Sequence, residues 1–225
     1  YVMAQLTEVG LEPTYLESEP RRGTVIVRLE GADPTRPGLV VHGHTDVVPA
    51  KAEDWSVDPF GAEVIDEMVW GRGAVDMKNM DAMILANVRE FVRTGTKPAR
   101  DTTVIFFADE EAGGRFGSHW LVDHHPEFFE GATEAISEVG GYSVTLPTPT
   151  GDPVRAYLLQ TAEKGLAWLT LRAHGRASHG SVPTQENAIV RLAEAITRID
   201  QHHWPREYVA SVRELLDGVS SITGT

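Results

Sequence analysis

The sequence predicts an α/β fold, with a largely parallel sheet in a first domain and a partial α+β domain after it. Apolar runs of strand length alternate with segments of helical spacing through the first part of the chain, as in parallel α/β sheets. Two of these runs, 38–44 and 102–108, are almost continuously apolar, which is typical of strands buried on both faces. After residue 157 a clean apolar–polar alternation replaces the continuous runs. We therefore expect domains at 1–157 and 158–225.

The elements of the first domain follow from the spacing of apolar residues and from the breakers between them. Gly31 and Pro34 end one run, and the apolar residues at 80, 84, 88 and 91 have helical spacing. In chain order we expect a helix over 1–10, strands over 24–29 and 38–44, an edge or hairpin strand over 64–70, a helix over 77–91, and strands over 102–108 and 134–137.

The second domain is expected to begin with a strand and a helix. Residues 166–173 alternate, which places Leu169, Leu171 and Ala173 on one side of a strand. After a polar loop, several apolar residues share one face of a helix; they are Ile189, Leu192, Ala193, Ile196 and Ile199. Residues 220–225 are expected to form a weakly patterned tail.

Composition and charge exclude several classes of protein. The chain has 225 residues and a formal net charge of −13, which argues against a nucleic-acid surface, where Lys and Arg cluster. It has no cysteine, which excludes disulfides, Cys-ligated zinc and thiol nucleophiles. No apolar stretch is long enough to predict a transmembrane helix, and no signal peptide is visible, so a cytoplasmic location is the default expectation. The sequence starts at Tyr1 inside an expected helix, so we expect the natural chain to start earlier.

Side chains of the types that bind metal ions lie at the carboxyl ends of the expected strands. His44, Glu110, Glu111 and Glu138 each end or follow an apolar run, and Asp76 lies between a Gly-containing turn and a helix. In open α/β sheets, ligands bind in the crevice at the carboxyl ends of the strands. One histidine with several carboxylates is a suitable ligand set for a hydrolytic metal centre.

Each of these signals has a structural alternative. His44 and Asp46 share a strand face, so Asp46 could accept from the second ring nitrogen of a metal-bound histidine, or the two could be a buried histidine beside a turn. Asp76 could span two cations, or it could cap the helix, which is worth ~1 kcal/mol. The three acids of DEEAGG could be held together at a site where a cation or protons compensate their mutual repulsion. Alternatively, they could form a solvated acidic loop.

Four sequence motifs, taken together, form a much more specific signal than any one of these residues. GHTDVVP, GRGAVDMK, DEEAGG and SEVGG, in this order and spacing, resemble the dinuclear zinc peptidases and acylases. That family includes aminoacylase, succinyl-diaminopimelate desuccinylase, glutamate carboxypeptidase and carnosinase-like dipeptidases. The later strings EKGLAW and GRASHGSVPTQENAI resemble the start of the family's lid, or dimerisation, domain. The resemblance implies that 1–157 is the N-terminal part of a catalytic domain and that 158–225 is the first part of the lid.

The resemblance also implies a ligand set. His44 and Glu138 would bind one zinc, Asp76 would bridge both zincs, and Glu111 would bind the other. Two Zn²⁺ ions per active site are expected in the full-length protein, and nitrogen and oxygen ligands also suit cobalt or manganese. The family's second zinc takes a further histidine from the C-terminal part of the catalytic domain, which this sequence does not contain. We therefore expect a chain truncated at the C-terminus.

Three residues have implied catalytic roles. Glu110 would be the general base, Asp46 would orient the histidine ligand, and His179 would match the lid histidine that reaches the partner subunit's active site and stabilises the oxyanion. The implied function is hydrolysis of an amide bond in a peptide or N-acyl amino acid, by a homodimer, with this stretch inactive by itself. The alternative is a non-catalytic homologue, or an inactive fragment, that binds metal or a small ligand without turnover.

His42 suggests one further alternative. With His44 it forms an HxH pair, the opening motif of barrel-type amidohydrolases. That fold needs further metal histidines at later strand ends, whereas the later strand ends here have DEE and SEV. We therefore expect His42 to be a packing residue or a partner of a ligand.

Overall fold

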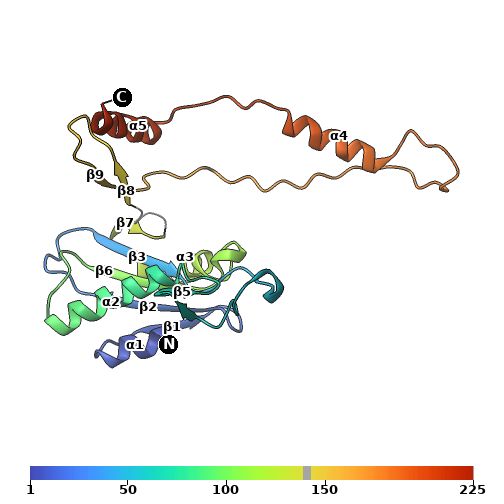
Figure 1. Ribbon diagram of the computed structural model, residues 1–225. Coiled ribbons are helices and arrows are strands. Elements are labelled where there is room, and N and C mark those ends of the chain that lie inside the picture. Colours follow the sequence, from blue (N-terminus) through green and yellow to red (C-terminus); the bar gives the residue numbers. More distant parts are fainter. Residues whose placement is uncertain (139–142, 225) are drawn as a thin grey trace. The chain divides into compact units, whose positions relative to one another are not determined.

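The computed structural model describes residues 1–138 and 143–224, which fall into two units, Tyr1–Val139 and Gly140–Thr225. Figure 1 labels the elements of both units. Those of the first unit are α1 (Val2–Glu8), β1 (Thr14–Glu17), β2 (Gly23–Leu29), β3 (Gly38–His44), β4 (Glu63–Ile65), β5 (Met68–Trp70), α2 (Lys78–Thr94), β6 (Thr102–Phe107), α3 (Ser118–His124) and β7 (Ala132–Ile136), with short 3₁₀ turns η1 (Ala52–Asp54), η2 (Glu110–Ala112) and η3 (Pro126–Phe129).

The main sheet of the first unit is mixed, with strand order β1-β2-β6-β3-β7. Strands β6, β3 and β7 are parallel, whereas β1, β2 and β6 pair antiparallel. The expectation of a largely parallel sheet is therefore wrong for half of the pairings. For β1 and β2 the physical reason is local, because the turn 18–22 is too short for a crossover and can join only antiparallel neighbours. The parallel half is the part that positions the site.

The helices cover both faces of this sheet, because alternate residues of each buried strand point to opposite sides. One core contains Leu6 from α1 and Leu85 from α2, packed on β2 and β6. The other contains Leu121 from α3, packed on Ile105 and Phe107 of β6. Every residue of β6 is buried, as the continuous apolar run predicts. The expected strand at 64–70 is the two-stranded hairpin β4–β5.

Gly43 of β3 lies against the first turns of α2, next to His44. A Cβ atom at Gly43 would lie 2.3 Å from Asp81 Oδ1 and 2.8 Å from Met77 Cε. We expect Gly43→Ala to lower the free energy of unfolding by about 1–3 kcal/mol, the usual cost of overpacking. Gly38→Ala, on the same strand, is the matched control, because its nearest neighbour would be Gly131 O at 3.4 Å. Chemical denaturation measures both; equal effects would show that α2 does not press on Gly43.

The second unit contains β8 (Ser143–Leu146) paired antiparallel with β9 (Val154–Tyr157), followed by α4 (Ala188–Asp200) and α5 (Ala210–Thr223). Helix α4 matches the expected helix, and Asn187 caps it by accepting from the amide of Ile189 at 2.9 Å. The expected tail at 220–225 is wrong over 220–223, the last turn of α5. Val212, Leu215 and Leu216 have the helical spacing that identifies this helix.

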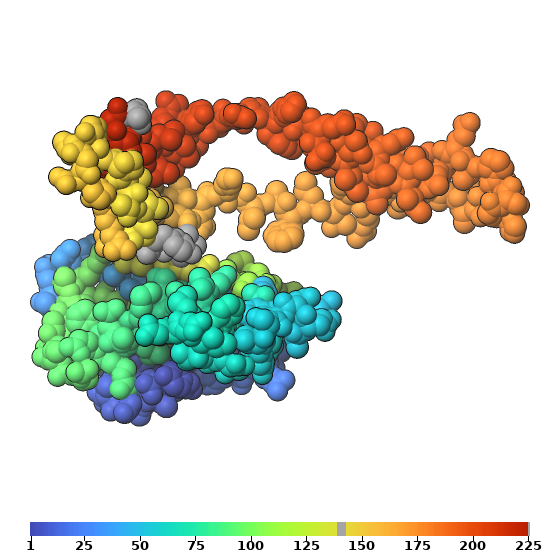
Figure 2. All heavy atoms as spheres, in the orientation of Figure 1, coloured from blue at the N-terminus to red at the C-terminus, as the bar shows by residue number. Residues whose placement is uncertain are grey.

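The expected strand at 166–173 is also wrong, because these residues have no regular structure. Trp168 is 91% exposed and Leu166 is 86% exposed. Figure 2 shows the segment without neighbouring atoms along most of its length. A strand needs a partner for its backbone N–H and C=O groups, and none of the described strands lies beside it.

None of the helices in the described part of the chain combines the length and the apolar composition that a membrane span requires.

Candidate metal centre

His44 is at the centre of the candidate site. It ends β3, and its side chain is 2% exposed. The ring atom Nε2 lies 3.0 Å from Asp76 Oδ1, 2.9 Å from Glu138 Oε2 and 3.8 Å from Glu110 Oε2. These carboxylates come from three segments, the loop before α2, the turn η2 after β6, and the residues after β7. The carboxyl ends of the three parallel strands therefore bring one imidazole and several carboxylates together, as the sequence predicts.

The hydrogen bonds of the imidazole leave Nε2 facing two acceptors. Nδ1 lies 3.1 Å from the backbone oxygen of Asp46, which can only accept, so Nδ1 is the donor. In the neutral ring Nε2 then carries a lone pair, which faces the Asp76 and Glu138 oxygens. Among the described residues, Glu138 Oε2 is buried without a hydrogen bond. Such an arrangement is unfavourable unless a second proton or a cation lies between the ring and the carboxylates. The donor set therefore fits a metal ion.

Electrostatics around His44 point the same way. Burial lowers the pKa of His44, but Glu138, the Asp76 hydrogen bond and Glu110 outweigh burial, so its pKa is raised. Burial raises the pKa of Glu110, and the neighbouring carboxylates of Glu138 and Glu111 raise it further against the opposing effect of His44. The site is a concentration of negative charge that holds protons when no other cation is bound.

Asp46 connects the histidine to the acidic turn. Its carboxylate accepts hydrogen bonds from the backbone amides of Glu110 and Glu111, at 3.1 Å each. Its Oδ1 atom is 3.5 Å from His44 Nδ1, whereas its backbone oxygen makes the shorter contact. Asp46 therefore orients the ring through its main chain and positions both glutamates through its side chain.

Asp76 is not a helix cap in this structure. Helix α2 begins at Lys78, its N-cap residue is Met77, and the cap has no side-chain hydrogen bond. The Asp76 side chain is 67% exposed and faces His44. Lys78 donates to the backbone oxygen of Thr45 at 2.6 Å, which ties the start of α2 to the end of β3.

The three acids of DEEAGG separate into two environments. Asp109 is 2% exposed, lies 3.0 Å from Arg22 Nε, and accepts a hydrogen bond from the amide of Phe116 at 2.9 Å. Its charge is therefore compensated by Arg22 and by the amide of Phe116. Glu110 and Glu111 remain at the site, so the repulsion that the sequence suggested concerns two of the three acids.

Two sets of ligand atoms lie close enough to hold an ion, each with its atoms within 4.8 Å of one another. The first consists of His44, Asp76 and Glu111, and the second of His44, Glu110 and Glu138. All four expected metal ligands and the expected base thus converge. His179 belongs to the second unit, where its Nδ1 atom lies 2.9 Å from Ser181 Oγ.

His42 lies on the same strand as His44 and belongs to the packing beside the site. His42 packs edge-on against Phe107, with ring centroids 5.5 Å apart, and its Nδ1 atom is 3.3 Å from Ser137 Oγ. It is a packing residue, and the open sheet excludes the barrel alternative.

Asp81 is a buried acid that the sequence did not lead us to expect, although an acid between the apolar positions 80, 84 and 88 of a buried helix face is a signal of such a residue. It is 6% exposed, and burial raises its pKa to about 6.

Comparison with known proteins identifies the family. Residues 40–222 match the model of Peptidase family M20/M25/M40, and the chain belongs to that family. The resemblance that the four strings indicated is confirmed.

The chain is also similar to individual proteins. The chain is 35% identical over 162 residues to succinyl-diaminopimelate desuccinylase of Rhodospirillum centenum, covering 71% of this chain and 40% of the relative. It is 31% identical over 183 residues to the N-fatty-acyl-amino acid synthase/hydrolase of Xenopus tropicalis, covering 81% and 35%. The solved structure of the di-peptidase Dug1p from Saccharomyces cerevisiae shares the fold, with a TM-score of 0.52 at 22% identity, covering 65% of this chain and 34% of that one. The chain thus spans less than half the length of these relatives.

Proposed function

We propose that this chain supplies the metal centre and the general base of a hydrolase that cleaves amide bonds in peptides or N-acyl amino acids. One observation supports the proposal above all others. The imidazole of His44 and four carboxylates from three separate segments converge at the carboxyl end of the parallel strands. Family membership supports the same reaction class, because two of the relatives are, by name, an N-fatty-acyl-amino acid synthase/hydrolase and a succinyl-diaminopimelate desuccinylase.

His44, Asp76, Glu111 and Glu138 would hold the metal, which we propose to be zinc, with cobalt or manganese also suited to nitrogen and oxygen ligands. When bound, zinc supplies a Lewis acid that polarises the scissile carbonyl and lowers the pKa of water toward ~7. Glu110 would accept the proton of the attacking water and return it to the leaving amine. Its carboxylate is 51% exposed and next to His44, so solvent and substrate can reach it.

Residues 158–225, which lie within the second unit, would form the first part of the lid. We propose residues 1–157 as the N-terminal part of the catalytic domain. His179 would donate to the developing oxyanion as a preorganised group, and the lid would mediate a homodimer. An amphipathic α4 supports this assignment, because Ile189 and Ile196 are 78% and 53% exposed on the chain alone.

The direct test is hydrolysis by the natural protein that contains this chain. N-acyl amino acids and dipeptides are incubated with the zinc-loaded and the chelator-treated protein, and the released amine is quantified. Zinc-dependent release supports the proposal. Metal binding without release from either substrate class would favour the non-catalytic homologue instead.

A further prediction concerns Asp46. Asp46→Ala removes both acceptors that position the amides of Glu110 and Glu111, so we expect zinc affinity to fall by about 10–100-fold, as for other residues that orient ligands. Asp46→Asn retains one acceptor oxygen and is expected to lie between the alanine variant and wild type. Asp58→Ala is the matched control, because Asp58 also accepts from a backbone amide, that of Phe60, in an exposed loop. Competition with a chromogenic chelator measures all three; unchanged affinity in Asp46→Ala would remove this role.

A further inference from the structure

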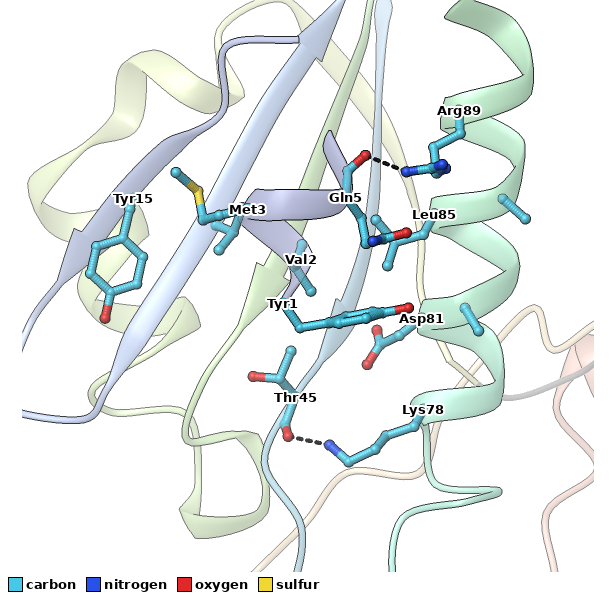
Figure 3. A pocket seen from close by; sticks show the side chains of 13 residues that line it. Tyr1, Val2, Met3, Gln5, Tyr15, Thr45, Lys78, Asp81, Leu85 and Arg89 are labelled. Atoms are coloured by element: carbon cyan, nitrogen blue, oxygen red, sulfur yellow. Dashed lines mark hydrogen bonds between the residues drawn. The ribbon is translucent and has the colours of Figure 1, made fainter. Parts of the chain in front are cut away.

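The parallel strands β3 and β6 are held at their carboxyl ends by different groups. At the end of β3, Lys78 of α2 donates a hydrogen bond to the backbone oxygen of Thr45 at 2.6 Å, which Figure 3 marks with a dashed line. After β6, the segment 109–117 carries Glu110 and Glu111 of the candidate metal centre. Contacts that fix this segment therefore fix the position of the two glutamates.

The segment 109–117 closes on itself at Asp109. Its side-chain Oδ2 atom accepts a hydrogen bond from the amide of Phe116 at 2.9 Å, and its backbone oxygen accepts from the amide of Gly114 at 2.7 Å. Asp109 has a φ of 69°, in the left-handed region that residues with a side chain seldom adopt. Because Asp109 directly precedes η2, a change in its backbone would move Glu110 and Glu111.

Arg22, in the turn between β1 and β2, holds the side chain of Asp109. Arg22 Nε lies 3.0 Å from Asp109 Oδ1, and the carboxylate is buried. A buried carboxylate that loses its counter-charge is strongly destabilised, so this pair is expected to resist displacement. Ser18 of the same turn donates a hydrogen bond to the backbone oxygen of Phe116. The turn 18–22 therefore contacts the segment 109–117 near both of its ends.

We propose that Arg22 is a positioning residue for the general base, and that it acts through Asp109 on the turn that carries Glu110. The inference rests on the proposed function, in which Glu110 is that base. Asp46 holds the amides of Glu110 and Glu111 from the end of β3, while Arg22 fixes the residue before them from the start of β2. A base must lie within hydrogen-bond reach of the proton it accepts, so a small displacement of this turn lowers the rate.

A second ion pair between β2 and β6 supplies a matched control. The two strands are antiparallel, and at their other end Arg28 Nη2 lies 2.8 Å from Asp101 Oδ2. Both pairs connect the same two strands, but Arg22 contacts the end of β6 that leads to Glu110, whereas Arg28 contacts the residue before β6. If the arginines only join the strands, Arg22→Ala and Arg28→Ala should have the same effects. Positioning of the base predicts that they differ.

The first readout needs no substrate and no metal. Hydrogen exchange of the segment 109–117 is measured by mass spectrometry on the chelator-treated natural protein that contains this chain. We expect exchange in this segment to be about 10-fold faster in Arg22→Ala than in wild type, and unchanged in Arg28→Ala. Exchange that is unchanged in Arg22→Ala would overturn the inference, because Arg22 would then not hold the turn.

The second readout is hydrolysis of a series of N-acetyl amino acids and dipeptides by the zinc-loaded protein. On the best substrate of the series, Arg22→Ala is expected to lower kcat about 10-fold with little change in KM, whereas Arg28→Ala is expected to match wild type. Arg22→Lys, which retains the charge, is expected to recover most of the loss. Because Arg22 acts through Asp109, the losses in the double variant Arg22→Ala/Asp109→Asn are expected to be smaller than the product of the two single losses.

The possible failures are distinguishable. Wild-type kcat in Arg22→Ala, or equal losses in Arg22→Ala and Arg28→Ala, would overturn the inference and leave the proposed function intact. A wild-type protein that hydrolyses no member of the series would contradict the proposed function, and the inference with it. Circular dichroism checks the fold of each variant. If Arg22→Ala does not fold, Arg22→Met, which keeps most of the side-chain length without the charge, takes its place with the same expected losses.

Discussion

Replacing Glu110 by glutamine is expected to lower the rate of amide hydrolysis by about 10²–10⁴-fold, the usual contribution of a general base. The amide cannot accept the proton of the attacking water, but it has nearly the same shape. The backbone amide of Glu110 keeps its hydrogen bond to Asp46, and the side chain is 51% exposed, so the fold and the turn are preserved. Zinc content is therefore expected to stay close to that of wild type.

The comparison is made in the natural protein that contains this chain, with kcat and metal content measured on the same preparation. Glu53→Gln, an exposed glutamate on η1, is the matched control and is expected to retain full activity. A Glu110→Gln protein with wild-type kcat would show that another group moves the proton. Loss of zinc together with activity would instead assign Glu110 to the ligand set, consistent with its place beside His44 and Glu138.

Asp76→Ala is expected to have the largest effect on metal binding. The Asp76 Oδ1 atom is 3.0 Å from His44 Nε2, and Asp76 completes one of the two ligand sets with Glu111. Loss of the proposed bridging ligand should cost more than the 10–100-fold typical of removing an orienting partner, so we expect at least about 100-fold weaker zinc binding. Because the side chain is 67% exposed, the substitution leaves the core intact.

Asp123→Ala on α3 controls for the general loss of a negative charge and is expected to bind zinc normally. Zinc affinity is measured by competition with a chelator, and circular dichroism checks the fold. If Asp76→Ala retains wild-type affinity, the first ligand set is not a metal site, and the second set, with Glu110, would have to account for any binding.

The sequence predicted the parallel half of the sheet and the convergence of the site well. Strand β3 has the predicted bounds, and β6 differs by one residue, because a continuous apolar run between breakers specifies a buried strand with little ambiguity. Once these strands are parallel neighbours, their carboxyl ends meet at one edge. His44 and the DEE acids are thereby brought together without any knowledge of the contacts between them.

The remaining features depend on contacts that spacing alone does not encode. Asp109 is compensated by Arg22, which is distant in sequence and reaches it only once β2 and β6 are paired. Among the described residues the Oδ1 atom of Asp81 has no hydrogen-bond partner that would identify it, and the burial of Asp81 follows from the packing of α2 against β3. The alternating segment 166–173 has the pattern of a strand, but among the described residues it has no neighbouring strand to pair with, and the pattern cannot supply one.

The measurement that tests the central claim most directly is the zinc content of the wild-type chain after loading and dialysis, determined by elemental analysis against protein concentration. The convergence of His44 with Asp76, Glu111 and Glu138 predicts at least about one tightly held zinc per chain, released by acid as the ligands take up protons. A chain that retains no zinc, cobalt or manganese under these conditions, while remaining folded, would contradict the assignment of these residues as a metal centre.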